Sequence, residues 1–329
     1  MIRRYANNQH ELGADIATDP RQTSFYKAMA RCTGVLLILD PDGTPFTRAW
    51  CCFEEAMVVR DAARTGAPLL LDVATVDSKG QAHATTQGPT AADQKRYDAL
   101  SDYRKSQTSV NRIKMEREKS FPRAVLERGF RVDTFNSAAS VAIDRTRIFN
   151  AICGVPPDQL DAVVPRAEDP AFLDVDAALS GLFAEAALWL AAQAGELAGT
   201  VEVLRRDTAR RHVRLHIPGA TEPSLAALAP AFRAWPALTE VDLLASNSAL
   251  TELAGLEALA DCPQLAVVHG DFASCAQLAD VAALGAGLGQ LQALTALHLS
   301  FEECSQLHDS LRRSFDIDSR ADFLAALGA

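Results

Sequence analysis

The side chains best suited to chemistry in the first half of the chain lie together in residues 45–55, the string Pro-Phe-Thr-Arg-Ala-Trp-Cys-Cys-Phe-Glu-Glu. The guanidinium of Arg48 could pair with a diphosphate, or it could neutralise the carboxylate of Glu54. The two adjacent cysteines open an expected helix, whose dipole lowers the pKa of a thiol. Neighbouring residues on a helix point about 100° apart, so neither the two thiols nor Glu54 and Glu55 form a facing catalytic pair.

Two apolar runs flank this stretch and would position it. Residues 34–40 and 67–73 lack alternation, which is typical of strands buried on both faces of a parallel sheet. Residues 46–65 carry apolar side chains at helical spacing and end before Gly-Ala-Pro, a helix stop signal. Strand, turn, helix and strand in this order predict a βαβ unit of an open α/β sheet. The stretch would then lie just beyond the carboxyl end of a strand, where such sheets bind ligands.

The motif in this stretch resembles that of the Toll/interleukin-1 receptor (TIR) family, whose helix after the third strand carries Trp-Cys-x-x-Glu. Trp50, Cys51 and Glu54 match it residue by residue. A short helix from Ser24 and an extended start at residues 4–8 fit the preceding elements of that fold. The resemblance covers residues 2–154 and implies an open parallel, flavodoxin-like sheet.

The resemblance also implies a reaction, because some TIR domains cleave NAD to nicotinamide and an ADP-ribose product. It assigns the catalytic role to Glu54, and it places Arg48 and Trp50 beside the nucleotide. A carboxylate suits this chemistry, since breaking the nicotinamide–ribose bond builds positive charge on the sugar. Arg48 stands where plant-type active members have a serine. Many TIR domains are scaffolds that self-associate, and in that case Trp50 would belong to the core and Glu54 to a surface ion pair.

The second half contains a repeat. Residues 272–280 and 301–309 share Phe, Cys, Gln, Leu and Asp at identical offsets. A second pattern, LxxLxL, begins at residues 238 and 294 and in part at residue 265. A degenerate first copy of it begins at residue 212. This pattern resembles the leucine-rich repeat family over residues 200–315, which implies a short α/β solenoid of stacked strands and returning helices. The cysteines of the repeats are expected to be small buried hydrophobic residues.

The function implied by such repeats is binding through the exposed strand face. That face is expected to display eight residues: Thr239, Glu240, Asp242, Ala266, Val267, Thr295, Ala296 and His298. His269 and His298 fall at related positions of neighbouring strands, but two histidines without an evident carboxylate do not predict a metal site. The sequence therefore predicts no metal and no bound cofactor, with NAD as a substrate if the protein is an enzyme.

Composition limits the alternatives. The 329 residues carry a net charge of −10, which argues against a nucleic-acid partner. Seven cysteines without CxxC spacing, and a start without a signal peptide, predict a reducing, cytoplasmic setting. No run approaches the roughly 18 apolar residues needed to cross a bilayer, so no membrane span is expected. Residues 95–131 contain 11 Lys or Arg against 5 Asp or Glu, which indicates a solvated charged helix or a basic face for an anionic ligand.

Three parts follow along the chain: a TIR-like α/β domain in residues 1–154, a linker with an amphipathic helix in residues 155–200, and the repeat array in residues 201–329. Helices are expected at 122–130, 144–153 and 170–194. The favoured function is an interaction or signalling protein that recognises a protein partner through the repeats and self-associates through the TIR-like part. An NAD hydrolase that uses Glu54 and a docking subunit of a larger assembly are the alternatives.

Overall fold

The computed structural model describes residues 18–61, 69–101, 109–217 and 219–327 of the chain. The strand expected at residues 4–8 lies outside these ranges. The chain divides into two compact units, each of which we describe by itself. Unit 1 comprises Met1–Gly88 and Ser120–Ser180, and unit 2 comprises Pro89–Lys119 and Gly181–Ala329. The segment 89–119 therefore belongs to the same unit as the second half of the chain. The sequence predicted boundaries only near residues 154 and 200, so this division was not predicted.

Unit 1 contains a three-stranded sheet in the order β1 (Gly34–Leu39), β2 (Leu70–Val76) and β3 (Ala82–Thr85). β1 and β2 are parallel, and α4 (Ala49–Asp61) lies between them in sequence, so the predicted strand–helix–strand order is confirmed. β3 is antiparallel to β2. Burial on both faces was a wrong expectation for β1, because Leu36 and Ile38 are 44% and 49% exposed while Leu37 and Leu39 are buried.

The core of unit 1 forms where the apolar face of α4 meets α8 (Ala142–Ile152). Phe53 and Ala56 of α4 and Phe149 of α8 are almost completely buried. The rings of Phe135, Phe149 and Phe172 contact one another with centroids 5.3–5.5 Å apart. Among the described residues, the unit also contains η1 (Pro20–Gln22), α3 (Ser24–Met29), η2 (Thr44–Thr47), α7 (Arg123–Gly129) and η4 (Pro157–Gln159). The helices expected from Ser24 and at 122–130 and 144–153 are thus confirmed.

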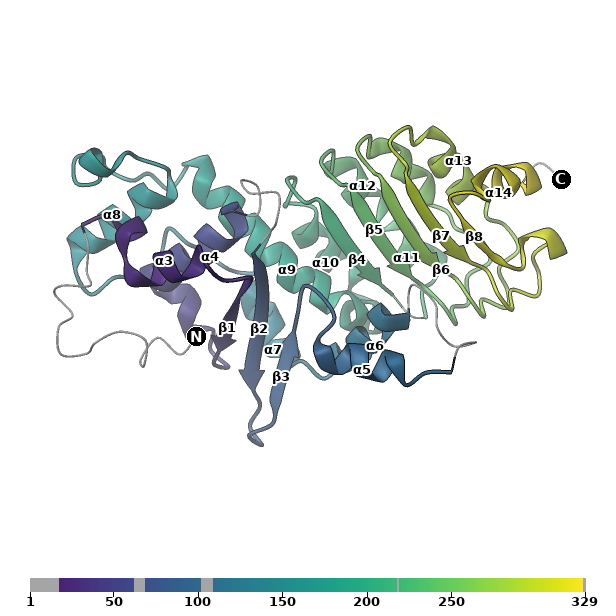
Figure 1. Cartoon of the computed structure of the whole chain (residues 1–329), viewed down its shortest axis with the longest axis horizontal. Coiled ribbons are helices and arrows are strands. Elements are labelled where there is room, and N and C mark those ends of the chain that lie inside the picture. Colours follow the sequence, from purple (N-terminus) through teal and green to yellow (C-terminus); the bar gives the residue numbers. More distant parts are fainter. Residues whose placement is uncertain (1–17, 62–68, 102–108, 218, 328–329) are drawn as a thin grey trace. The chain divides into compact units, whose positions relative to one another are not determined.

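Unit 2 is built on a five-stranded sheet whose strands follow the order of the sequence (Figure 1). The strands are β4 (His212–His216), β5 (Glu240–Leu244), β6 (Val267–Asp271), β7 (Ala296–Ser300) and β8 (Ser314–Asp316). The first four are parallel, and paired residues on successive strands are 28, 27 and 29 positions apart. β8 is antiparallel to β7. The chain is therefore of the α/β class, with a mostly parallel larger sheet.

Helices connect and flank these strands, and their apolar side chains complete the core with the leucine face of the sheet. They are α10 (Leu197–Leu204), α11 (Glu222–Ala226), α12 (Ala229–Ala234), η5 (Leu256–Asp261), α13 (Ala282–Gln290), η6 (Asp309–Leu311) and α14 (Arg320–Ala326). Val213, Leu215, Val241, Leu243 and Leu297 are at most 4% exposed. Every second strand residue thus faces this core, and the residues between them face the other way.

The turns after the strands repeat one geometry. Asn247, Ser274 and Glu303 each follow a strand by three residues and adopt the left-handed region, with φ of 56°, 60° and 62°. Next to them, Cys275 and Cys304 are fully buried, and their thiols donate to the carbonyls of Ala245 and Phe272 one repeat earlier. The prediction that these cysteines are buried structural residues is confirmed.

Two further elements complete the chain. α5 (Ala91–Asp98) and α6 (Ser109–Glu118) belong to unit 2 and carry much of the basic segment. α9 (Pro170–Ala194) contributes to both units and is long and apolar enough to cross a membrane by length and composition. Half of its most apolar stretch is buried within the protein, so it also meets the description of a core helix.

Candidate functional site

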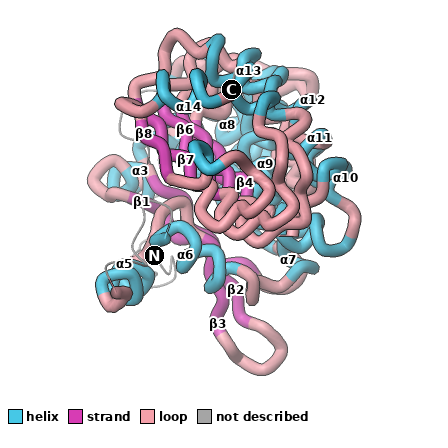
Figure 2. Tube along the Cα trace, turned by 90° about the vertical axis from the view of Figure 1, so that its right-hand side faces the viewer, coloured by secondary structure: helices cyan, strands magenta, loops and turns pink. Residues whose placement is uncertain are grey.

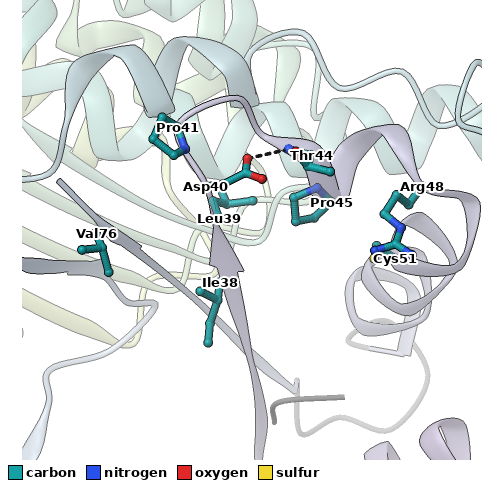
Figure 3. Close-up of a pocket in the computed structure, with 9 residues that line it drawn as sticks. All are labelled: Ile38, Leu39, Asp40, Pro41, Thr44, Pro45, Arg48, Cys51 and Val76. Carbon is teal, nitrogen blue, oxygen red and sulfur yellow. Dashed lines mark hydrogen bonds between the residues drawn. The ribbon is translucent and has the colours of Figure 1, made fainter. Parts of the chain in front are cut away.

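The predicted motif adjoins an open cavity of about 440 Å³ at the carboxyl end of β1 (Figure 3). The turn after β1 forms one side of it, where the carboxylate of Asp40 accepts a hydrogen bond from the amide of Thr44 at 2.8 Å. Arg48 and Cys51 line the cavity from the start of α4, and Val76 lines it from β2. The cavity thus lies beyond the end of the strand at which the sequence predicts ligand binding, and the binding itself stays a prediction.

The other two predicted residues of the motif lie elsewhere on α4. Glu54 and Trp50 are half-buried and are not among the residues that line this cavity. The ring of Trp50 packs edge-on against Phe53 with centroids 6.3 Å apart. The assignment of catalysis to Glu54 and of nucleotide contact to Trp50 therefore stays a prediction, whereas Arg48 is in place to contact a ligand of this cavity.

The neighbouring Cys52 and Glu55 face the core. Burial raises the pKa of the Cys52 thiol far above its ordinary value, although the helix dipole was expected to lower it, and Sγ donates to the carbonyl of Phe46 at 3.3 Å. Burial, aided by the charges of Glu54 and Asp176, also raises the pKa of Glu55 well above its ordinary value. Burial therefore favours the neutral form of both groups, and the Cys52 thiol is protonated at neutral pH.

A second cluster of polar groups lies on the exposed face of the sheet in unit 2. The strand register places five polar side chains in one row across β4 to β8: Arg214, Asp242, His269, His298 and Asp316. The predicted adjacency of His269 and His298 is confirmed by this register. The expectation that no carboxylate lies near them was wrong, because Asp242 is the neighbour of His269 on the other side.

Asp242 is the centre of this row and is only 2% exposed. Its Oδ1 accepts a hydrogen bond from Nδ1 of His269 at 2.7 Å, and its Oδ2 lies 3.4 Å from Nε2 of His212. Burial raises the pKa of Asp242, but the hydrogen bonds from the two histidines outweigh burial and hold the pKa below its usual range. The hydrogen bond to Asp242 in turn raises the pKa of His269. An ionised carboxylate is thus held beneath the surface by surrounding donors.

The helix α6 of the same unit makes contacts with this face. The amide of Asn111 donates to Oδ2 of Asp242 at 3.1 Å, and the guanidinium of Arg112 pairs with Asp271 on β6, which is 1% exposed. Arg117 of α6 forms an ion pair with Asp93 of α5, in which Nη2 lies 3.0 Å from Oδ2. Figure 2 shows α10, α11 and α12 on one side of the strands and α6 on the other. Two buried carboxylates on neighbouring strands therefore hold two successive side chains of one helix.

Sequence reasoning named Glu240, Asp242 and His298 as exposed-face residues but missed His212, Arg214 and Asp271, as well as the contact with α6. His212 and Arg214 could have been found by aligning the degenerate copy at residue 212 with the next repeat, because the strand register follows that alignment. The contact with α6 joins Arg112 to Asp271, 159 positions away in sequence, and no local sequence pattern predicts such a contact. Glu240, His212 and Asp242 also form a group of potential metal ligands.

Comparisons with known proteins do not assign the chain. No family model matches it, and no curated protein and no solved structure matches it either.

Proposed function

We propose that this chain is a cytoplasmic protein-interaction protein, in which unit 2 is a leucine-rich repeat module that binds a partner through its exposed sheet face. The observation that carries this proposal is the pair of buried carboxylates, Asp242 and Asp271, held by Asn111 and Arg112 of α6. A buried charge costs free energy unless it is paired, so carboxylates at a surface without a cationic partner are costly. The face is therefore suited to a helix that presents arginine and amide side chains.

The repeat assignment is supported by three periodic features of unit 2. Successive parallel strands are offset by 28, 27 and 29 residues, within the range of leucine-rich repeats. The left-handed turn residues recur at Asn247, Ser274 and Glu303. Cysteine thiols bond to carbonyls of the preceding repeat. In a leucine-rich repeat array, each repeat covers the apolar edge of its neighbour.

Unit 1 supplies the signalling half of this proposal as a TIR-like domain that self-associates. Its support is the order β1, α4 and β2, with the Trp50, Cys51 and Glu54 motif in the first turns of α4. Pairing such a domain with a recognition module is typical of sensor proteins, and we extend this only as an analogy, since a fold does not fix a function.

The binding proposal can be tested with the helix that the face already holds. A labelled peptide with the sequence of residues 109–119 is titrated against the full chain carrying Asn111→Ala and Arg112→Ala, which removes the two polar contacts that α6 makes with Asp242 and Asp271. We expect binding that weakens with added salt, because it depends on charge pairs. Adding Asp271→Asn should weaken binding at least about 10-fold, since a buried charge pair loses one partner.

The matched control is Asp261→Asn, whose carboxylate lies on η5 and pairs with Arg233 away from the strands. This change should leave the affinity for the peptide unaltered. If the peptide fails to bind, or if the two aspartate variants bind it equally, then the sheet face is not a site for an arginine-bearing helix.

A second candidate function is NAD hydrolysis, and one observation favours it: the cavity at the carboxyl end of β1, with the guanidinium of Arg48 in its lining. An arginine there could pair with the diphosphate of a dinucleotide. In this proposal Glu54 stabilises the charge that develops on the ribose, and NAD is a substrate rather than a resident cofactor.

A further inference from the structure

Three potential ligands for a metal ion meet on the exposed sheet face of unit 2. They are His212 of β4 and Glu240 and Asp242 of β5, and their ligand atoms all lie within 4.8 Å of one another. Nε2 of His212 is 3.6 Å from Oε1 of Glu240 and 3.4 Å from Oδ2 of Asp242. One imidazole nitrogen and two carboxylate oxygens therefore lie close enough together to contact a single ion.

These two separations fit tetrahedral coordination of one metal ion. Zinc bonds to nitrogen and carboxylate oxygen are about 2.0–2.2 Å long, which places neighbouring tetrahedral ligands about 3.3–3.6 Å apart. The distances from His212 to Glu240 and to Asp242 lie at these values without any movement of the backbone. A donor set of imidazole and carboxylate is one that zinc and related divalent transition metals bind.

The positions of the ligands are fixed by the sheet. His212 and Glu240 are register partners on neighbouring parallel strands, and Asp242 is the next residue of β5 on the same face. Asp242 is also held in place by its other oxygen, which accepts the hydrogen bond from His269 at 2.7 Å. Carboxylates that ligate metal ions in proteins are themselves held by hydrogen bonds of this kind.

The surroundings allow an ion to enter. The side chains of His212 and Glu240 are 33% and 38% exposed, so water can reach the site and complete the coordination. Nε of Arg214 lies 3.7 Å from Oδ2 of Asp242, and its charge is partly balanced by Glu185, 3.9 Å away. The hydrogen bond from Asn111 to Oδ2 of Asp242 occupies the ligand atom, so an ion must replace it.

We propose that His212, Glu240 and Asp242 bind one divalent transition-metal ion of the zinc type, with water as the fourth ligand. The site is open, because three protein ligands leave one position free. This proposal does not depend on the partner-binding function. It also couples metal binding to α6, because the ion and the side chain of Asn111 compete for the same oxygen, Oδ2 of Asp242.

The test uses cobalt(II) as a spectroscopic probe and zinc in calorimetric titrations, both with the full chain. We expect one ion per chain and the intense visible absorption of tetrahedral cobalt. Glu240→Gln and His212→Ala each remove a ligand and should weaken binding by at least about 10-fold. His269→Ala should weaken it about 10- to 100-fold, the range for residues that orient a ligand. Asn111→Ala should bind the ion at least as tightly as the parent chain.

Matched controls come from the turn after β7, where His308→Ala and Glu302→Gln remove the same chemical groups at an exposed site. Both should bind cobalt as the parent chain does. The inference is overturned if the parent chain binds no stoichiometric ion, or if the ligand variants bind it as well as these controls. Peptide binding to the sheet face is measured separately without metal, so failure of one proposal leaves the other intact.

Discussion

Asp242 and His269 are partners across the parallel strands β5 and β6, with Oδ1 of the aspartate 2.7 Å from Nδ1 of the histidine. The aspartate is buried on the face opposite the leucine core, where its charge is compensated by donors from three elements. A polar cluster of this kind stabilises only while every member is paired.

Removing the central carboxylate should therefore destabilise unit 2. Asp242→Ala deprives His212, His269 and Asn111 of their common acceptor, and we expect the free energy of unfolding to fall by about 2–3 kcal/mol. Denaturant titration with hydrogen exchange of β5 and β6 measures the change. Asp318→Ala, at an exposed position after β8, should change it by no more than about 0.5 kcal/mol. Equal effects of the two substitutions would show that the cluster contributes nothing to stability.

The repeats could be predicted because their signal is local and periodic. Leucines and cysteines recur at fixed offsets, and each repeat uses the same short strand and turn, so the sequence near residues 238, 265 and 294 was enough to place β5, β6 and β7. The contact between Arg112 and Asp271 was not predictable in this way. This contact joins a charged helix to a strand that is distant in sequence. The sequence of a charged helix does not indicate whether its side chains are solvated or pair with a carboxylate elsewhere in the protein.

Unit 1 illustrates a different limit. The apolar runs located β1 and β2, but they did not reveal which faces are buried, since Leu36 and Ile38 are as apolar as the core residues beside them. The strand β3 was missed because Ala-His-Ala-Thr contains only one β-branched residue, Thr85, and none of the Val, Ile, Tyr, Phe or Trp residues that indicate a strand. Its pairing with β2 depends on the turn between them and on the backbone rather than on side-chain pattern.

The structural role of the repeat cysteines predicts a clear division in thiol reactivity. Burial raises the pKa of Cys262 to about 12 and that of Cys275 to about 11, and both side chains are inaccessible. Cys32 is exposed. A disulfide reagent such as Ellman's should therefore modify Cys32 rapidly in the folded chain, and Cys32→Ser should remove one equivalent of thiol from that rapid phase. Cys262 and Cys275 should react only after denaturation, and their rapid modification in the native chain would contradict the buried arrangement.

Two buried carboxyl groups of unit 1 predict a dependence of stability on pH. Burial raises the pKa of Asp176 to about 6, and it also raises that of Glu55, with the charges of Glu54 and Asp176 adding to the shift. The folded chain then binds more protons than the unfolded chain above pH 4, since free carboxyl groups titrate near pH 4. Stability from these groups is therefore present below pH 4 and is lost as the pH rises through 6 and beyond.

Glu55→Gln removes one of the two carboxyl groups that cause this effect without changing the shape of the side chain. Within the described residues neither oxygen of Glu55 has a hydrogen-bond partner, so the amide loses no contact that the acid makes. We expect the midpoint of thermal unfolding of unit 1 to rise by at least about 2 °C at pH 8 and by less at pH 4. Asp176→Asn keeps the oxygen that accepts from Thr134 and should show the same trend. An equal or larger gain at pH 4 would contradict a raised pKa.

The enzymatic proposal rests on Glu54 and is tested by nicotinamide release from NAD, followed by chromatography. If Glu54 stabilises the developing charge on the ribose, Glu54→Ala should fold normally and lose activity about 100-fold or more, the usual cost of removing such a group. Glu127→Ala, which removes an exposed glutamate of α7 that pairs with Arg123, should retain full activity. Arg48→Ala should raise KM more than it lowers kcat, because its side chain lines the cavity and pairs with the diphosphate rather than with the reacting bond. No release by the parent chain at high concentration, with crowding agents that promote assembly, would exclude hydrolysis of NAD and leave unit 1 as a scaffold.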